Sequence, residues 1–155
     1  MKAYASTLKV IGVSVREEQA KYRAKRQVRG ADNGSSVLVE LRPGLVPFAS
    51  VQTLADKVQV DPARLLSLIG LSGRTAARRK VQGYLEPAEA DRLLRIARVV
   101  EEAMRIFGSE QKAARWLNSP HPTLENVEPL AVLDSDAGVK TVSDELVRID
   151  FGDYA

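Results

Sequence analysis

The stretch LADKVQVDPARLLSLIGLSGRTAARRK, residues 54–80, carries the signals of short helices in close succession. Asp61 can cap a helix with Pro62 in its first turn, where proline is tolerated. Residues 54–66 have the pattern of a helix-turn-helix, with Val60 as the apolar residue of the turn. We therefore expect a helix-turn-helix here, although a three-helix bundle that does not bind DNA follows the same packing rules.

The end of this stretch, SGRTAARRK (residues 72–80), holds four basic side chains and no acidic one. With Ser72 as its N-cap, it predicts a further helix that projects positive charge. Arginine and lysine neutralise DNA phosphates, and arginine also pairs with guanine. The alternative is a solvated charged turn, the usual role of a charge run. The candidates for DNA contact are Arg64, Arg74, Thr75, Arg78, Arg79 and Lys80.

The residues before the stretch include a basic N-terminal arm, residues 1–45. Its segment TLKVIGVSV (7–15) is rich in β-branched residues and predicts a short strand, and VLVELRPG (37–44) predicts a second one. Between them, REEQAKYRAKRQVRG (16–30) is compatible with a helix that has a thin apolar face. Closer to the stretch, Ser50 is expected to cap the first of the clear helices.

The residues after the stretch predict more helices and so an all-α fold. LEPAEADRLLRIARVVEEAMRIFG (85–108) is the longest, and its apolar residues recur every three or four positions. Further helices are expected over residues 109–119, with Ser109 as N-cap and Trp116 in the core, and over residues 135–150. A loop with three prolines (120–129) and one helical turn separate them. The predicted buried residues of the longest helix are Leu93, Ala97, Val100, Met104 and Phe107.

Charge divides the chain near the end of the quoted stretch. Residues 1–83 carry 15 Lys and Arg against 6 Asp and Glu, a net +9, whereas residues 84–155 carry 8 against 14, a net −6. The split predicts two partners of opposite character, although solvated faces also differ in sign by chance. We expect a basic arm (1–45), a helix-turn-helix domain (46–83) and a C-terminal helical domain (84–155), with any short β element confined to the arm.

The sequence offers no catalytic or metal-binding set of residues. It has no cysteine, and its single histidine, His121, lies in the proline-rich loop without a second histidine as partner. Acid–base catalysis and metal binding both need converging groups, so we expect a protein that is not an enzyme and binds no cofactor. The first residues do not have the pattern of a signal peptide, and no apolar run reaches about 18 residues. We therefore expect a cytoplasmic protein without a membrane partner.

The segment LVRIDFGDYA (146–155) is the second informative feature. It places Phe151 and Tyr154 beside Asp150 and Asp153, and aromatic side chains next to acids can anchor a segment in a basic pocket of a partner. Packing of both aromatic rings onto the last helix is the alternative. The candidates for partner contact are Arg148, Ile149, Asp150, Phe151, Gly152, Asp153 and Tyr154.

Three segments together resemble the Xre/MbcA/ParS type of antitoxin. They are RTAARRK (74–80), GYLEPAEADRLLRIARV (83–99) and FGSEQKAARWLNSPHPTLENVEPLAVLDSDAGVKTVSDELVRIDFG (107–152). The resemblance covers roughly residues 54–155 and is strongest in the second half. It implies an Xre-like helix-turn-helix domain followed by a C-terminal toxin-binding domain, and it assigns the segment 148–154 to the toxin.

The resemblance also implies partners. The chain would bind and neutralise a cognate RES-domain toxin that consumes NAD, by blocking its active site, and would repress its own operon by binding operator DNA. We hypothesise that Asp150 and Asp153 imitate the negative charge of the NAD pyrophosphate. A homodimer is expected because such repressors usually contact two half-sites. The alternative is a stand-alone Xre-type transcriptional regulator whose C-terminal domain only dimerises.

Overall fold

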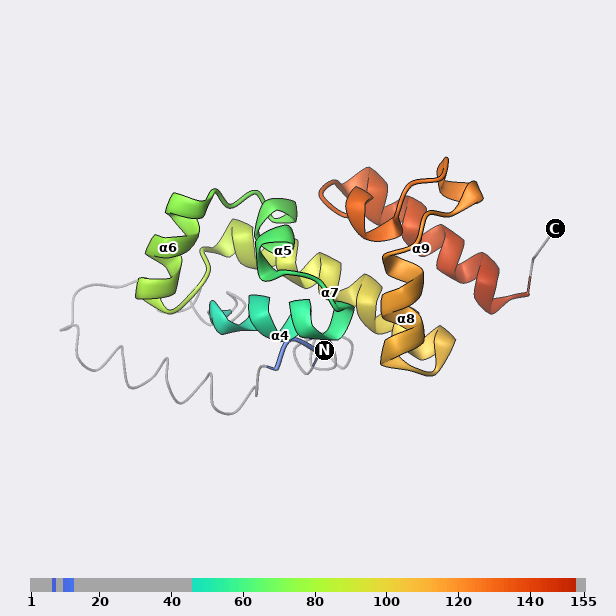
Figure 1. The fold of residues 1–155 in the computed structure, drawn as a ribbon, viewed down its shortest axis with the longest axis horizontal. Coiled ribbons are helices and arrows are strands. Elements are labelled where there is room, and N and C mark those ends of the chain that lie inside the picture. Colours follow the sequence, from blue (N-terminus) through green and yellow to red (C-terminus); the bar gives the residue numbers. More distant parts are fainter. Residues whose placement is uncertain (1–6, 8–9, 13–45, 153–155) are drawn as a thin grey trace, which may run out of the picture.

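The computed structural model describes residues 7, 10–12 and 46–152 (Figure 1). In this part of the chain, six named α-helices and two 3-10 helices follow one another without a strand, so the predicted all-α fold is confirmed. The elements are α4 (Ala49–Val58), α5 (Pro62–Leu68), α6 (Gly73–Gln82), α7 (Pro87–Phe107), α8 (Glu110–Leu117), η1 (Pro122–Leu124), η2 (Pro129–Val132) and α9 (Asp136–Asp150).

Helix α7 is the central element of the fold. It runs along the longest axis of the molecule, with α4, α5 and α6 around its first half and α8 and α9 around its second half (Figure 1). Leu93, Ala97 and Val100 are fully buried as predicted, and Met104 and Phe107 pack partly buried against the same core. Burial of such apolar side chains is the main stabilising term of the fold. None of the described helices is long and apolar enough to cross a membrane.

Local capping signals set most helix boundaries. Asp61, Ser72 and Ser109 cap α5, α6 and α8 as predicted, because each side chain accepts a hydrogen bond from an N–H in the first turn. Gly70 and Gly108 follow α5 and α7 with φ of 77° and 65°, a left-handed conformation that costs glycine nothing. The capping residues in the sequence therefore locate the ends of these helices to within one turn.

The start of α4 differs from the prediction, because Ser50 is not the N-cap. Its side chain is buried inside the first turn, and the N-cap position is Phe48, which makes no side-chain cap. The chain before α4 is instead held by backbone hydrogen bonds. The N–H of Phe48 donates to the carbonyl of Gly83 (3.0 Å), and the N–H of Leu85 donates to that of Val46 (2.9 Å). Long-range pairing, not a local cap, thus fixes this helix start.

Ile11 of the N-terminal arm belongs to the core. Thr7 and Val10 are helical, so the strand predicted over 7–15 is wrong at these two positions. Ile11 is fully buried, and the hydroxyl of Thr7 donates a hydrogen bond to the carboxylate of Glu101 in α7 (2.8 Å). The other two predictions for the arm, a second strand and a helix-compatible segment, lie outside the described residues.

Helix α9 begins against the turn formed by η2. Ser135 caps it by accepting a hydrogen bond from the N–H of Gly138 (3.1 Å). A Cβ atom at Gly138 would collide with the backbone carbonyl of Val132, so only glycine fits here. Farther along α9, Val142 and Leu146 are fully buried and pack the helix onto the core. The contact of α9 with η2 and the burial of Val142 and Leu146 therefore fix the direction of this helix.

Candidate functional site

Two successive tight connections join α4, α5 and α6. Between α4 and α5, Gln59 has φ of 56° and Val60 packs partly buried against the core. Between α5 and α6, Gly70 is left-handed and Leu71 is buried. Both connections have the helix-turn-helix form of a short turn with an apolar residue pointing inward. The sequence pattern predicts the connection between α4 and α5, and the structure adds the one between α5 and α6.

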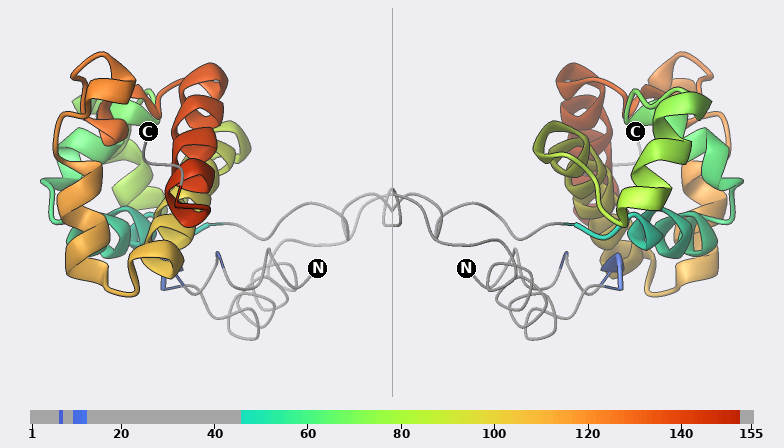
Figure 2. Two further views of the ribbon diagram at one scale, coloured as in Figure 1. Left: turned by 90° about the vertical axis from the view of Figure 1, so that its right-hand side faces the viewer. Right: turned by 90° about the vertical axis from the view of Figure 1, so that its left-hand side faces the viewer.

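Helix α6 lies at one end of the molecule, which faces the viewer in the right view of Figure 2, and it carries exposed basic side chains. Arg74, Ala77, Arg78 and Val81 are three or four residues apart, so they share one side of the helix, and all four are exposed. Arg74, Arg78 and the neighbouring exposed Lys80 form no ion pair with any residue in the described part of the chain. We call residues 74, 77, 78 and 81 the outer stripe of α6.

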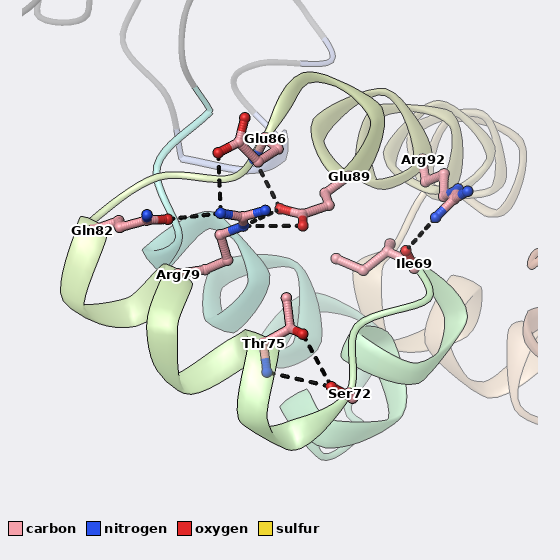
Figure 3. A network of polar contacts seen from close by, with 8 residues as sticks. All are labelled: Ile69, Ser72, Thr75, Arg79, Gln82, Glu86, Glu89 and Arg92. Carbon is pink, nitrogen blue, oxygen red and sulfur yellow. Dashed lines mark hydrogen bonds and ion pairs between the residues drawn. The ribbon is translucent and has the colours of Figure 1, made fainter.

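Arg79 lies on the opposite side of α6 and is only 8% exposed. Its Nε donates to both carboxylate oxygens of Glu89 at 3.0 and 2.9 Å (Figure 3). Its Nη1 donates to Gln82 at 2.8 Å and to Glu86 at 3.0 Å. The guanidinium group, predicted from the sequence as a DNA contact, is therefore occupied inside the protein. It ties α6 to the first turn of α7.

Glu89 has two roles at this junction. Besides binding Arg79, its carboxylate accepts a hydrogen bond from the backbone N–H of Glu86 (2.8 Å), which completes a capping box at the start of α7. Nearby, the side chain of Arg92 donates to the carbonyl of Ile69 at the end of α5 (3.0 Å; Figure 3). Residues of α7 therefore hold both α5 and α6 in place.

Two other predicted DNA contacts are engaged within the protein. Arg64 on α5 is half-buried, forms an ion pair with Glu128 and donates to the amide oxygen of Asn118 (3.4 Å). Thr75 takes part in the cap of α6, since its hydroxyl lies 3.1 Å from that of Ser72. The structure thus places Arg74 and Arg78 on one open face of α6, leaves Lys80 exposed on another side of the same helix, and engages the remaining candidates within the protein.

Helix α9 ends at the opposite end of the molecule, which faces the viewer in the left view of Figure 2, and two apolar side chains are exposed there. Phe151 is 83% exposed and Val147, one turn earlier, is 42% exposed. The alternative that Phe151 packs back onto the last helix does not occur in the structure. Val147 is not among the sequence candidates, although its position four residues before Phe151 places both on one side of a helix. We call Val147 and Phe151 the apolar pair of α9.

The charged candidates around this pair are partly neutralised within the chain. The carboxylate of Asp150 binds Arg105 of α7 (2.9 Å), and Arg148 binds Glu145 (3.0 Å). Ile149 packs partly buried against the core, while Gly152 is exposed. The remaining two candidates, Asp153 and Tyr154, lie outside the described residues. Among the described candidates of this segment, Phe151 is therefore the one whose side chain is exposed and has no partner within the described residues.

Comparison with known proteins identifies two domains in the chain. Residues 37–98 match the model of the antitoxin Xre-like helix-turn-helix domain, and residues 102–152 match the model of the antitoxin Xre/MbcA/ParS C-terminal toxin-binding domain. The chain is 31% identical over 106 residues to "Antitoxin Xre" of Photorhabdus laumondii subsp. laumondii, which covers 64% of this chain and 72% of the relative. The chain belongs to the Xre family of antitoxins.

Two other Xre antitoxins show similar relationships. That of Yersinia enterocolitica serotype O:8 is 29% identical over 98 residues, 62% of this chain and 66% of its own length. That of Pseudomonas putida is 34% identical over 61 residues, 39% of this chain and 38% of its own length. The chain thus spans about two thirds of the Yersinia and Photorhabdus antitoxins.

The two Xre-family domains contact each other directly. The amide of Asn118, which follows α8, donates to the carbonyl of Val58 at the end of α4 (2.7 Å). The ammonium of Lys57 lies 3.3 Å from the carboxylate of Glu110. The ion pair between Arg64 and Glu128 also crosses this boundary. The helix-turn-helix domain is therefore docked onto the toxin-binding domain.

His121 has a structural role in the toxin-binding domain. Its ring stacks on Trp116 with centroids 5.0 Å apart, and its Nε2 lies 2.9 Å from the carbonyl oxygen of that residue. Trp116 is buried as predicted and also contacts Phe107, at a centroid distance of 5.6 Å. Within the described residues, no group of three or more His, Asp or Glu side chains could hold a metal ion.

Proposed function

We propose that this antitoxin neutralises its cognate toxin through the end of α9 and represses its own operon through α6. The observation that carries the proposal is the separation of two chemically different open surfaces. The outer stripe of α6 and Lys80 lie at one end of the longest axis, and the apolar pair of α9 lies at the other (Figure 1). One chain can then hold DNA and a protein without competition for the same surface.

The DNA-binding part of the proposal rests on unpaired cations. Arg74, Arg78 and Lys80 are exposed and make no internal ion pair among the described residues, so they are free to replace counterions on phosphates. Arg79 and Arg64 are left out of this contact set because their guanidinium groups already bind carboxylates. Thr75 is left out because it serves the cap of α6.

The toxin-binding part rests on Phe151 and Val147. An exposed aromatic ring beside a second apolar side chain suits the centre of a protein interface, where a few buried anchors carry most of the affinity. The ion pair between Asp150 and Arg105 argues against a purely charge-based mimic of a ligand, since part of the negative charge is neutralised. In our proposal the aromatic anchor enters the cleft of the toxin, and Asp153 and Tyr154 extend the contact.

We further propose that the toxin is a RES-domain protein that consumes NAD, and that the antitoxin acts in the cytoplasm as a homodimer without catalytic activity or cofactor. Support for this comes from the Xre-family membership and from the helix-turn-helix domain, since repressors of this type usually contact two half-sites. The alternative function is a transcriptional regulator whose C-terminal domain only dimerises.

The deciding experiment uses the purified chain and the protein encoded beside it. We expect the wild-type chain to form a complex with that protein and to abolish its NAD consumption. Phe151→Ala should weaken this complex at least tenfold, because truncation of an interface anchor typically costs about 2 kcal/mol or more. Val127→Ala is the matched control, since Val127 is also an exposed apolar residue but lies in the loop after η1.

Three outcomes of this experiment decide between the antitoxin and the transcriptional regulator. Loss of inhibition by Phe151→Ala but not by Val127→Ala supports the proposal. Full inhibition by Phe151→Ala contradicts the assignment of the toxin surface. Absence of any complex, together with a change from dimer to monomer mass in solution after deletion of residues 150–155, would favour the dimerising regulator instead.

A further inference from the structure

Val81 is the most exposed large apolar side chain in the described part of the chain, at 90%. It lies in the last turn of α6, in a helix that is otherwise strongly polar on its open side. A β-branched residue is a poor choice for an exposed helical position, because it loses side-chain freedom there and gains no burial. Neither local helix stability nor packing within the described structure accounts for this side chain.

The surroundings of Val81 indicate what covers it. The outer stripe of α6 places Arg74 and Arg78 on the same side of the helix, with Lys80 adjacent, and α6 contains no acidic residue. The partner must therefore be strongly negative and yet offer small apolar groups at helical spacing. The DNA major groove has this combination, since phosphates flank it and the 5-methyl group of each thymine projects into it.

The stripe is held in a fixed orientation. Arg79, on the back of α6, binds Glu86 at the N-cap of α7 and Glu89 in its first turn, and Leu71, just before α6, is buried in the core. A side chain on a helix anchored at both ends can be aimed at a single base pair, which a mobile side chain cannot. The two apolar positions of the stripe, Ala77 and Val81, alternate with its arginines, so methyl contacts and guanine contacts fall next to each other.

We propose that Val81 is a specificity-determining residue that reads the 5-methyl group of thymine in the major groove, with Ala77 in the same role one turn earlier and Arg78 on a neighbouring guanine. This inference rests on the proposed DNA-binding function and deepens it, because it names the base chemistry that the antitoxin prefers. In this inference Val81 gives α6 a preference for certain bases, which basic side chains alone would not provide.

The test compares removal of the methyl groups from the protein with their removal from the DNA. A duplex that the wild-type chain binds is first selected from a random-sequence pool. Dissociation constants are then measured for that duplex and for versions in which single thymines are replaced by deoxyuridine, which lacks the methyl group. At one or two positions, we expect the replacement to weaken wild-type binding about fourfold, the value of one buried methylene-sized group.

Val81→Ala should weaken binding to the thymine duplex by a similar factor and lose its response to deoxyuridine at one of these positions. Alanine is the better helix former, so the variant should keep its fold. Val127→Ala should respond to deoxyuridine as the wild type does. This pattern would show that the methyl group of the base and the side chain of Val81 contact each other.

Other patterns would overturn the inference. If Val81→Ala keeps the wild-type response to deoxyuridine at every position, Val81 does not read thymine. Equal weakening on all duplexes would indicate a general effect on α6, and unchanged binding would indicate that a protein partner covers Val81. In these cases the wild type still binds DNA and the proposed function stands. A wild-type chain that binds no duplex would remove the DNA-binding function itself.

Discussion

Arg79 and Glu89 form a buried ion pair that joins α6 to the first turn of α7, with the Nε of the arginine 3.0 and 2.9 Å from the two carboxylate oxygens. Such a pair contributes little net stability when complete, but removal of one partner leaves an uncompensated charge in the interior. The basic helix α6 is thereby fixed in space by an arginine that faces inward.

Arg79→Met should destabilise the fold by about 3–5 kcal/mol, the typical cost of breaking a buried pair. Urea denaturation of the purified chain measures this change. Arg78→Ala on the open side of the same helix is the control, with an expected change within about 0.5 kcal/mol. The double variant Arg79→Met, Glu89→Gln should regain part of the loss, because no buried charge remains. Equal stability of Arg79→Met and wild type would refute the structural role.

Arg74→Ala together with Arg78→Ala should weaken DNA binding at least tenfold and reduce its dependence on salt, while binding to the toxin stays unchanged. Each arginine at a DNA contact typically contributes about 1–3 kcal/mol. Arg64→Ala should leave DNA affinity within twofold of wild type, since that guanidinium binds Glu128 in the free chain. Fluorescence anisotropy at several salt concentrations checks both. A larger effect of Arg64→Ala than of the double variant would reverse the assignment.

Gly138→Ala should destabilise the toxin-binding domain by about 1–3 kcal/mol, because the added Cβ meets the backbone carbonyl of Val132 and η2 must shift. Gly73→Ala is a matched control in the first turn of α6, where a Cβ would meet no atom within 4 Å. There we expect no loss and a gain of at most about 1 kcal/mol from helix propensity. Thermal unfolding followed by circular dichroism compares the two. Similar melting temperatures would contradict the close packing of Gly138 against Val132.

Asn118→Ala should destabilise the contact between the two domains by about 1–3 kcal/mol, because the carbonyl of Val58 loses its donor and stays partly buried. Hydrogen exchange of the amides at the end of α4 should accelerate in this variant. Ser119→Ala, which removes only a hydroxyl bonded to the carbonyl of Arg115 within the same turn, is the control. Unchanged exchange at α4 would show that Asn118 does not couple the domains.

The parts of the fold that could be predicted are those with local signals. Asp61, Ser72 and Ser109 were recognisable as caps because each precedes a helix whose first N–H groups need an acceptor. Ser50 has the same chemistry but is buried inside α4. The backbone hydrogen bond between Val46 and Leu85 positions the chain so that the helix begins before Ser50. Tertiary contacts overrode the local preference at that position.

The candidate site was predictable as a region but not residue by residue. A run of basic residues shows where charge is concentrated, and Arg74, Arg78 and Lys80 are exposed in the structure. The sequence does not show that Arg79 turns inward, because that depends on Glu89 across the turn into α7. Val81 and Val147 gave no signal of their own, since an apolar residue in a helix is normally assigned to the core.

Helix α7 belongs to both family domains, because the helix-turn-helix match ends at residue 98 and the toxin-binding match starts at residue 102. After Pro87 the helix contains no proline or glycine, so nothing in its sequence provides a hinge. In the proposed function, a rod of this kind, about 30 Å long at 1.5 Å per residue, would keep the DNA at one end and the toxin at the other at a constant separation. We would then expect any influence of the bound toxin on promoter occupancy to come from crowding between neighbouring copies on the DNA, and not from bending of α7.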